Sequence, residues 1–286
     1  MRYLISGASG FIGSNLLKYL EENGHEFKVI KREWFNDINK LALVCLNYNP
    51  DYVVHLASFG NMAWQSDEDE MVSANILKTY LLLKVTKEIP YKLFVNVSTS
   101  SVYGRRIDAM REDQALRGES FYAVTKIAGE GLCKAFSNRY DDWMYIKPIL
   151  TIRPFSLFGE YEDDRRFIPT VIRSIKNNTE FKLDENAFHD WMYIKDFIDA
   201  LILLTDRGTT GTINIGTGVQ RTNLQVVNMI SELMNRKAMY KSVGELRLGD
   251  SRYSWVADIT ELKKVGFKEK YGFEEGIKET IKFYEK

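Results

Sequence analysis

The sequence RYLISGASGFIG occupies residues 2–13 and decides the fold of this chain of 286 residues. Its first part, Arg2–Ser6, is mostly apolar and predicts a short strand. Gly7, Gly10 and Gly13 follow, and an amphipathic helix is expected over residues 14–23. A glycine turn between a strand and a helix lets the backbone approach a pyrophosphate, and the helix N-terminus supplies amides. This stretch therefore predicts a dinucleotide-binding unit.

The end of the second expected strand, residues 27–30, indicates which dinucleotide is bound. An acidic residue there hydrogen-bonds the adenosine ribose of NAD, whereas a basic residue accommodates the 2′-phosphate of NADP. Counted from Gly24, Lys31 stands at this point with Arg32 beside it, and Glu33 comes too late. We predict NADP, with NAD as the alternative, because Lys31 and Arg32 also suit a solvated basic pair on a loop.

The rest of the chain alternates strands and helices and then becomes more mixed. Further strands are expected at 51–57, 92–97, 149–152, 191–194 and 212–216, and further helices at 39–48, 67–88, 167–177, 196–206, 224–234 and 273–284. This order predicts an α/β protein with a doubly wound parallel (Rossmann) sheet and a smaller mixed C-terminal lobe. We assign residues 1–155 and parts of 190–220 to dinucleotide binding, and about 156–190 and 220–286 to a substrate-binding lobe.

Composition excludes several classes of protein. The 39 basic and 39 acidic residues balance, which argues against a nucleic-acid binder that works by bulk charge. No apolar run approaches the roughly 18 residues of a membrane span, and we see no signal peptide. Cys45 and Cys133 form no CxxC pair, and the three histidines show no metal-ligand spacing. We expect a cytoplasmic protein without a metal, nucleic-acid or membrane partner.

Tyr122 and Lys126 stand four residues apart in an expected helix that Ser120 caps, so they project from one face. A phenol loses its proton at about pH 10, and an ammonium one turn away favours the phenolate. Such a tyrosine can exchange protons with a hydroxyl or carbonyl. The pair also arises by chance in exposed helices, but hydroxyl residues at 98–101 follow a central strand, where open α/β sheets bind ligands.

Seven segments in this order resemble the extended short-chain dehydrogenase/reductases that epimerise, dehydrate or reduce nucleotide sugars. The segments cover nearly the whole chain and lie at residues 7–13, 51–57, 98–104, 122–126, 153–155, 214–216 and 247–250. The resemblance implies Thr99, Tyr122 and Lys126 as the catalytic residues. It implies cofactor contacts by the glycine turn and by residues further along the chain, namely Gly7, Ser9, Gly10, Phe11, Ile12, Gly13, Asp37, Ile38, Leu56, Ala57, Ser58, Asn75, Tyr122, Lys126 and Pro154. Lys31 and Arg32, at the end of the second strand, complete the predicted cofactor site.

Departures from the family pattern narrow the activity. Sugar 4,6-dehydratases of the family carry Asp-Glu directly after the catalytic hydroxyl residue, where this chain has Ser100 and Ser101, so we exclude dehydration. Ser156 stands where the family has a substrate asparagine, His189 where it has an arginine, and Arg166 where asparagine is common. The substrate-binding residues that the resemblance implies are Thr99, Ser100, Ser156, Arg166, His189, Arg247 and Asp250, with both arginines suited to a diphosphate.

The resemblance implies a nucleotide-diphosphate sugar as substrate and chemistry at its C4 carbon. We predict an NADPH-dependent 4-keto reductase. The alternatives are a redox-neutral 4-epimerase that retains its cofactor, and a cofactor-binding protein without catalysis. The family also implies a homodimer, formed by packing the helix of Tyr122 and the preceding long helix against a second copy.

Overall fold

The computed structural model describes residues 1–137, 147–244 and 253–286. The chain forms two compact units. Unit 1 comprises residues 1–104, 115–153 and 201–213, and unit 2 comprises residues 105–114, 154–200 and 214–286. The functional domain boundaries stay a prediction, because compactness does not say which ligand each part binds. Within the described residues, every helix is too short or too polar to cross a bilayer.

A six-stranded sheet with the order β2-β1-β3-β4-β5-β9 forms the centre of the fold. Its pairings from β2 through β5 are parallel, and β1 and β4 are almost fully buried, as in sheets that helices cover on both faces. The predicted doubly wound α/β fold is confirmed. The strands are β1 (Arg2–Ser6), β2 (Glu26–Ile30), β3 (Tyr52–His55), β4 (Leu93–Val97), β5 (Ile149–Pro154) and β9 (Gly211–Ile215).

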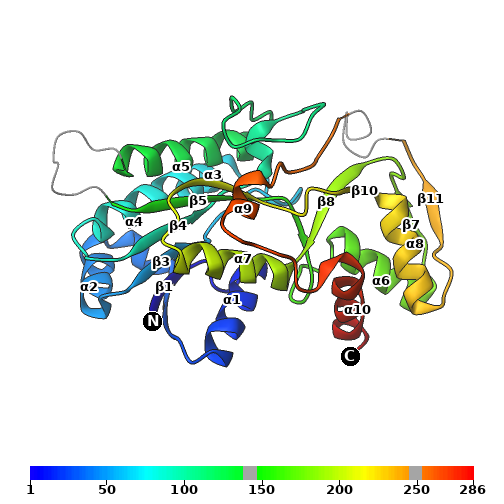
Figure 1. Ribbon diagram of the computed structural model, residues 1–286, viewed down its shortest axis with the longest axis horizontal. Helices are drawn as coiled ribbons and strands as arrows, with labels where there is room; N and C mark the ends of the chain where they lie inside the picture. The colour runs from blue at the N-terminus through cyan, green and yellow to red at the C-terminus, as the bar shows by residue number, and fades with distance from the viewer. Residues whose placement is uncertain (138–146, 245–252) are drawn as a thin grey trace. The chain divides into compact units, whose positions relative to one another are not determined.

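Helices α2, α4 and α5 cover one face of this sheet, and α1 lies on the other (Figure 1). Leu41 and Cys45 of α2, Leu82 of α4 and Cys133 of α5 enter one apolar core with strand residues such as Phe94. Both cysteines are free and buried. The helices of unit 1 are α1 (Phe11–Glu22), α2 (Ile38–Tyr48), α3 (Glu68–Val72), α4 (Lys78–Thr86) and α5 (Phe121–Ser137), with short 3-10 turns η1 (Arg32–Asn36) and η3 (Ser100–Tyr103).

Two helix predictions need correction. Helix α1 begins at Phe11 instead of Ser14, because Gly10 already has the extended backbone of an N-cap. The helix expected over 67–88 is interrupted by a π-helical turn, η2 (Ser73–Leu77), which separates α3 from α4. Its start is as predicted, since the Asp67 side chain accepts the backbone N–H of Glu70.

Unit 2 contains a mixed three-stranded sheet, β10-β8-β6, in which β8 pairs antiparallel with β10 and parallel with β6. This confirms the smaller mixed lobe. Helices α6, α8 and α10 pack on one another, and α10 packs on β8. The strands are β6 (Ser156–Phe158), β7 (Phe181–Leu183), β8 (Phe188–Tyr193), β10 (Gln220–Thr222) and β11 (Tyr240–Ser242); the helices are α6 (Phe167–Asn177), α7 (Ile194–Asp206, shared with unit 1), α8 (Asn223–Met234), α9 (Thr260–Lys264) and α10 (Gly272–Glu285).

Candidate active site

The three glycines of the first turn have different physical roles. Gly7 has a positive φ of 73°, and a Cβ there would lie 2.5 Å from the backbone nitrogen of Ala57. A Cβ on Gly13 would lie 2.5 Å from the Cα of Ala8, so this glycine lets the helix approach the strand. A Cβ on Gly10 would meet only the carbonyl of Gly7, at 3.5 Å. The open side of the turn is therefore at Gly10.

This turn fits the pyrophosphate of a dinucleotide. Ser9 and Gly10 are exposed, and α1 has no acidic side chain in its first turn. The first amides of a helix have no intrahelical partner, and the helix dipole favours an anion there. The loop Leu56–Ser58 adjoins the turn, because the Leu56 amide donates to the carbonyl of Ser6 at 3.0 Å. The structure thus brings the predicted turn and the predicted loop together.

The residues after β2 lie as the sequence indicated, but two of them have protein partners. The Arg32 guanidinium is 2.7 Å from the Glu70 carboxylate of α3, and most of its side chain is exposed. The Lys31 ammonium lies 5.9 Å from the centre of the Trp34 ring. Asp37 caps α2 by accepting the amides of Asn39 and Lys40, and Ile38 is the first residue of that helix. A ribose 2′-phosphate would compete with Glu70 for Arg32.

Tyr122 and Lys126 lie in the first turns of α5, where Ser120 accepts the amide of Ala123 as predicted. Both side chains are buried, with 8% and 4% of their residue surface exposed. The Lys126 ammonium donates to the carbonyl of Val97, the last residue of β4, at 2.8 Å. Burial lowers the pKa of Lys126 to about 8, against the opposing field of Glu130. A lysine whose pKa lies close to neutral pH therefore lies at the carboxyl end of β4.

Thr99 lies at the same end of β4 and is buried. Its hydroxyl accepts the Ser101 amide and donates to the Ser101 hydroxyl, both at 3.2 Å, so Thr99 caps the turn η3. Ser100 is also buried, and α5 packs on η3. Unit 1 therefore gathers Thr99, Ser100, Tyr122 and Lys126 around the strand end, while their catalytic roles stay a prediction.

Asn75 lies in the π-helical turn and does more than the sequence suggested. Its side chain exchanges two hydrogen bonds with the backbone of Phe59 and donates a third, of 2.9 Å, to the Thr125 hydroxyl of α5. It thus joins the loop after β3 to the helix that carries Tyr122. Sequence reasoning missed Thr125 and the buried His55 beside this network, because neither belongs to a spacing pattern.

The candidate substrate residues of unit 2 lie on its mixed sheet and on α6. Ser156 begins β6, and its hydroxyl is 3.3 Å from the Nδ1 atom of His189 on β8. Arg166 is the N-cap residue of α6, and its Nε donates to Glu162 at 3.2 Å. Pro154 ends β5. Arg247 and Asp250 lie outside the described residues.

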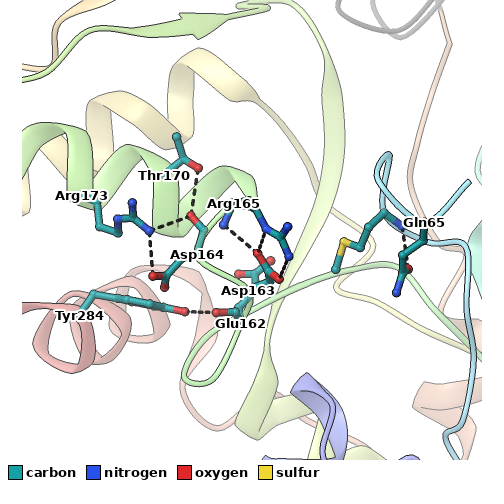
Figure 2. A network of polar contacts seen from close by, with 9 residues as sticks. Gln65, Glu162, Asp163, Asp164, Arg165, Thr170, Arg173 and Tyr284 are labelled. Atoms are coloured by element: carbon teal, nitrogen blue, oxygen red, sulfur yellow. Dashed lines mark hydrogen bonds and ion pairs between the residues drawn. The ribbon is translucent and has the colours of Figure 1, made fainter.

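The segment before α6 is held by a polar network (Figure 2). Asp163 pairs with Arg165, Asp164 pairs with Arg173 of α6, and the Tyr284 hydroxyl donates to the Glu162 carbonyl at 2.6 Å. Burial raises the pKa of the Glu162 carboxyl to about 7, although Arg166 opposes the rise. The network therefore places Arg166 beside a carboxyl that is half ionised near neutral pH.

The glycine turn and the buried pair Tyr122 and Lys126 together indicate the class of protein. A glycine turn between β1 and α1, with a tyrosine and a lysine one helical turn apart at the end of β4, is the arrangement of a nicotinamide-dinucleotide protein of the short-chain dehydrogenase type. Across residues 1–137, 147–244 and 253–286, no three histidine, cysteine or acidic side chains form a group that could hold a metal ion.

The model of the NAD dependent epimerase/dehydratase family matches residues 3–216, and the chain belongs to this family. The predicted family is confirmed. Among curated relatives, the dTDP-glucose 4,6-dehydratase of Haemophilus influenzae is 26% identical over 99% of this chain and 98% of its own length. The GDP-L-colitose synthase of Yersinia pseudotuberculosis is 25% identical, with coverage of 99% and 98%.

Solved structures agree with this assignment. MoeE5 in complex with UDP-glucose and NAD superposes with a TM-score of 0.88 and 28% identity, covering 100% of this chain and 99% of that one. The UDP-glucuronic acid 4-epimerase of Bacillus cereus, in complex with UDP-glucuronic acid and NAD, gives a TM-score of 0.86 and 25% identity, with the same coverage.

Proposed function

We propose that the protein is an oxidoreductase acting at C4 of a sugar that is linked to a nucleoside diphosphate. The observation that carries this proposal is the buried pair Tyr122 and Lys126 at the carboxyl end of β4. The substrate class rests on the relatives, whose names and complexes contain dTDP-glucose, UDP-glucose and UDP-glucuronic acid. A cytoplasmic location is part of the proposal, since the two free, buried cysteines suit a reducing compartment.

In this mechanism the Tyr122 phenol exchanges a proton with the C4 oxygen, and the Thr99 hydroxyl hydrogen-bonds the same oxygen. The Lys126 ammonium, anchored on Val97, favours the ionised phenol through its charge. When bound, the nicotinamide supplies the hydride chemistry at C4. The protein contributes positioning and polarisation.

For the cofactor we propose NADP, held at its pyrophosphate by the glycine turn and at its 2′-phosphate by Lys31 and Arg32. NAD is the alternative, because the family and the similar complexes are described with NAD. The fit of the turn supports either dinucleotide. We assign the remaining contacts to Asp37, Ile38, Leu56, Ala57, Ser58, Lys126 and Pro154, and Asn75 supports this side of the cofactor through its hydrogen bonds to Phe59.

For the substrate we propose that Arg166 and Arg247 bind the diphosphate, because a guanidinium offers two parallel donors to phosphate oxygens. Asp250, Ser156 and His189 complete the assignment on the nucleotide-sugar side, with Thr99 and Ser100 at the sugar. Serine and histidine replace the asparagine and arginine of the family pattern, so we expect a substrate preference unlike that of the named relatives.

The net reaction that we propose is NADPH-dependent reduction of a 4-keto sugar, which the basic pair Lys31 and Arg32 favours. The second candidate is redox-neutral 4-epimerisation, which is favoured by the similarity to solved 4-epimerases that are 25% and 26% identical. Dehydration is disfavoured in spite of the dehydratase relatives, because Ser100 and Ser101 are hydroxyl residues with no acid and base to remove water.

The proposed function is tested first by cofactor binding and then by turnover of nucleotide-linked sugars. The purified protein is denatured, any released nucleotide is identified, and the apoprotein is titrated with NADPH and NADH by calorimetry. An empty site that prefers NADPH at least about tenfold, or about 1.4 kcal/mol, supports the reductase. Co-purified NAD supports the epimerase and overturns the reading of Lys31 and Arg32.

Turnover is then assayed on nucleotide-linked 4-keto and 4-hydroxy hexoses. Tyr122→Phe should lose most turnover and still bind cofactor, whereas Tyr161→Phe, which changes an exposed tyrosine between β6 and α6, serves as the matched control. Near-normal turnover in Tyr122→Phe would refute the mechanism. Cofactor binding without turnover on any nucleotide sugar would favour a protein that binds cofactor without catalysis.

We also propose a homodimer. Leu77 and Tyr80, at the end of η2 and in α4, and Phe121 and Val124 of α5 are apolar or aromatic side chains between 38% and 54% exposed. Covering them would remove apolar surface from water. Sedimentation of wild type and of Leu77→Glu/Val124→Glu tests this, and a wild-type monomer at micromolar concentration would contradict it.

A further inference from the structure

A chain of buried side chains runs through unit 1 from the glycine turn to the π-helical turn. The Ser6 hydroxyl is 2.6 Å from Nδ1 of His55, Nε2 of His55 is 2.9 Å from the Thr79 hydroxyl, and that hydroxyl donates to the Asn75 carbonyl at 2.8 Å. We call this the Ser6–Asn75 chain. Its four residues are at most 2% exposed. Groups so buried depend on one another, because water cannot replace a lost partner.

The donor of each hydrogen bond in the Ser6–Asn75 chain can be assigned. The Thr79 hydroxyl has a single hydrogen, and a carbonyl accepts it, so His55 must donate through Nε2. Burial lowers the pKa of His55 to about 3, so the ring is neutral at pH 7, Nδ1 is an acceptor, and the Ser6 hydroxyl donates to it. Ser6 in turn accepts the amide of Ala57, at 3.4 Å, from the loop after β3. The partners at both ends thus fix the neutral tautomer of His55.

The chain ends at a residue that joins two parts of the site. Asn75 uses its amide oxygen and one N–H on the backbone of Phe59, and it also donates to the Thr125 hydroxyl. Thr125 donates onward to the carbonyl of Tyr122 at 2.8 Å. The contact is close, since a Cβ on Gly129 of α5 would lie 2.9 Å from the Asn75 carbonyl. Moving Asn75 would therefore move both the loop and α5.

We propose that His55 and Thr79 are positioning residues, which fix Asn75 and, through Thr125, the placement of Tyr122 against the loop that adjoins the glycine turn. They touch neither substrate nor cofactor in this role. The Ser6–Asn75 chain couples the dinucleotide side of unit 1 to the acid/base helix. The catalytic part of this proposal rests on the proposed function of Tyr122.

The test compares two buried threonines of α4. Thr79 and Thr86 each donate to the carbonyl four residues earlier, but only Thr79 contacts His55. Thr79→Val should lower kcat at least tenfold, shift the pH profile of kcat and change KM less than threefold. Thr79→Ser should restore kcat, because it keeps the hydroxyl. Thr86→Val should leave kcat unchanged at a similar cost in stability.

A second readout does not depend on turnover. Hydrogen exchange of the backbone should quicken in residues 56–60 and 121–127 of Thr79→Val, and not in Thr86→Val. If wild type turns over no nucleotide sugar, the proposed function fails while this comparison still decides the coupling. Equal kcat and equal exchange in the two valine variants would overturn the inference, as would a serine variant no better than the valine one.

Discussion

Replacing Glu162 by glutamine should remove a pH dependence of stability that the structure assigns to this carboxyl. Its side chain is 2% exposed, its Oε1 accepts from Arg166, and its Oε2 is buried without a hydrogen-bond partner among the residues that the structure describes. Burial raises the pKa from the ordinary 4.5 to about 7. The folded state therefore binds more protons than the unfolded state between these two values.

This difference in bound protons sets the sign and the size of the pH dependence of the free energy of unfolding. The stabilisation from a raised carboxyl pKa is complete below pH 4.5 and is lost as the pH rises through 7. The folded value lies about 2.5 above the ordinary one, and about 1.4 kcal/mol per pKa unit gives about 3–4 kcal/mol. Wild type should lose this free energy of unfolding between pH 4.5 and pH 8, relative to Glu162→Gln.

Urea denaturation across this range measures the effect, with far-UV dichroism and tryptophan fluorescence required to give coincident transitions. Glu279→Gln is a control of opposite sign, because the ion pair with Lys282 lowers the pKa of Glu279 and its contribution is lost as the pH falls. Parallel pH curves for wild type and Glu162→Gln would refute the reasoning.

Two further changes test the packing of unit 1 by urea denaturation. Glu130→Ala should lower the free energy of unfolding by about 3–5 kcal/mol, because it leaves the Arg153 guanidinium buried without its bidentate carboxylate partner. The double variant Glu130→Met/Arg153→Met should lose clearly less, and equal losses would contradict this. Gly13→Ala should lower the free energy of unfolding by about 1–3 kcal/mol and weaken cofactor binding, because the new Cβ meets the backbone of Ala8. Gly24→Ala has open space around its Cβ and a positive φ, so it is the control for backbone strain alone. Equal cofactor affinity in the two variants would contradict the prediction.

Much of the fold could be predicted because its signals are local. The glycine turn, the helix cap at Ser120 and the exact span of α6 are set by residues close in sequence. The four strands β6, β7, β10 and β11 were missed, since three residues are too few to show an alternating pattern. They exist because neighbouring elements pair with them.

The π-helical turn was missed for a different reason. Nothing in the sequence Ser73–Leu77 is unlike an ordinary helix, and the turn is supported by partners distant in the chain: His55 through Thr79, Phe59 and Thr125. Periodicity predicted a helix there, and it could not predict which carbonyl would bind which donor. Candidate site residues with a spacing signal were found, and residues that act through tertiary hydrogen bonds were not.

Burial also sets the charge states of His55 and Lys126 in unit 1. Burial lowers the pKa of His55 to about 3, and the charge of Lys126 adds to the effect. Burial lowers the pKa of Lys126 only to about 8, because Glu130 opposes it. At pH 7 the lysine is therefore charged and the histidine is neutral. A neutral ring can carry its single proton on Nε2, as the hydrogen bonds with Ser6 and Thr79 require. Burial thus keeps a second positive charge away from Lys126, whose ammonium would favour the ionised phenol in the proposed role of Tyr122.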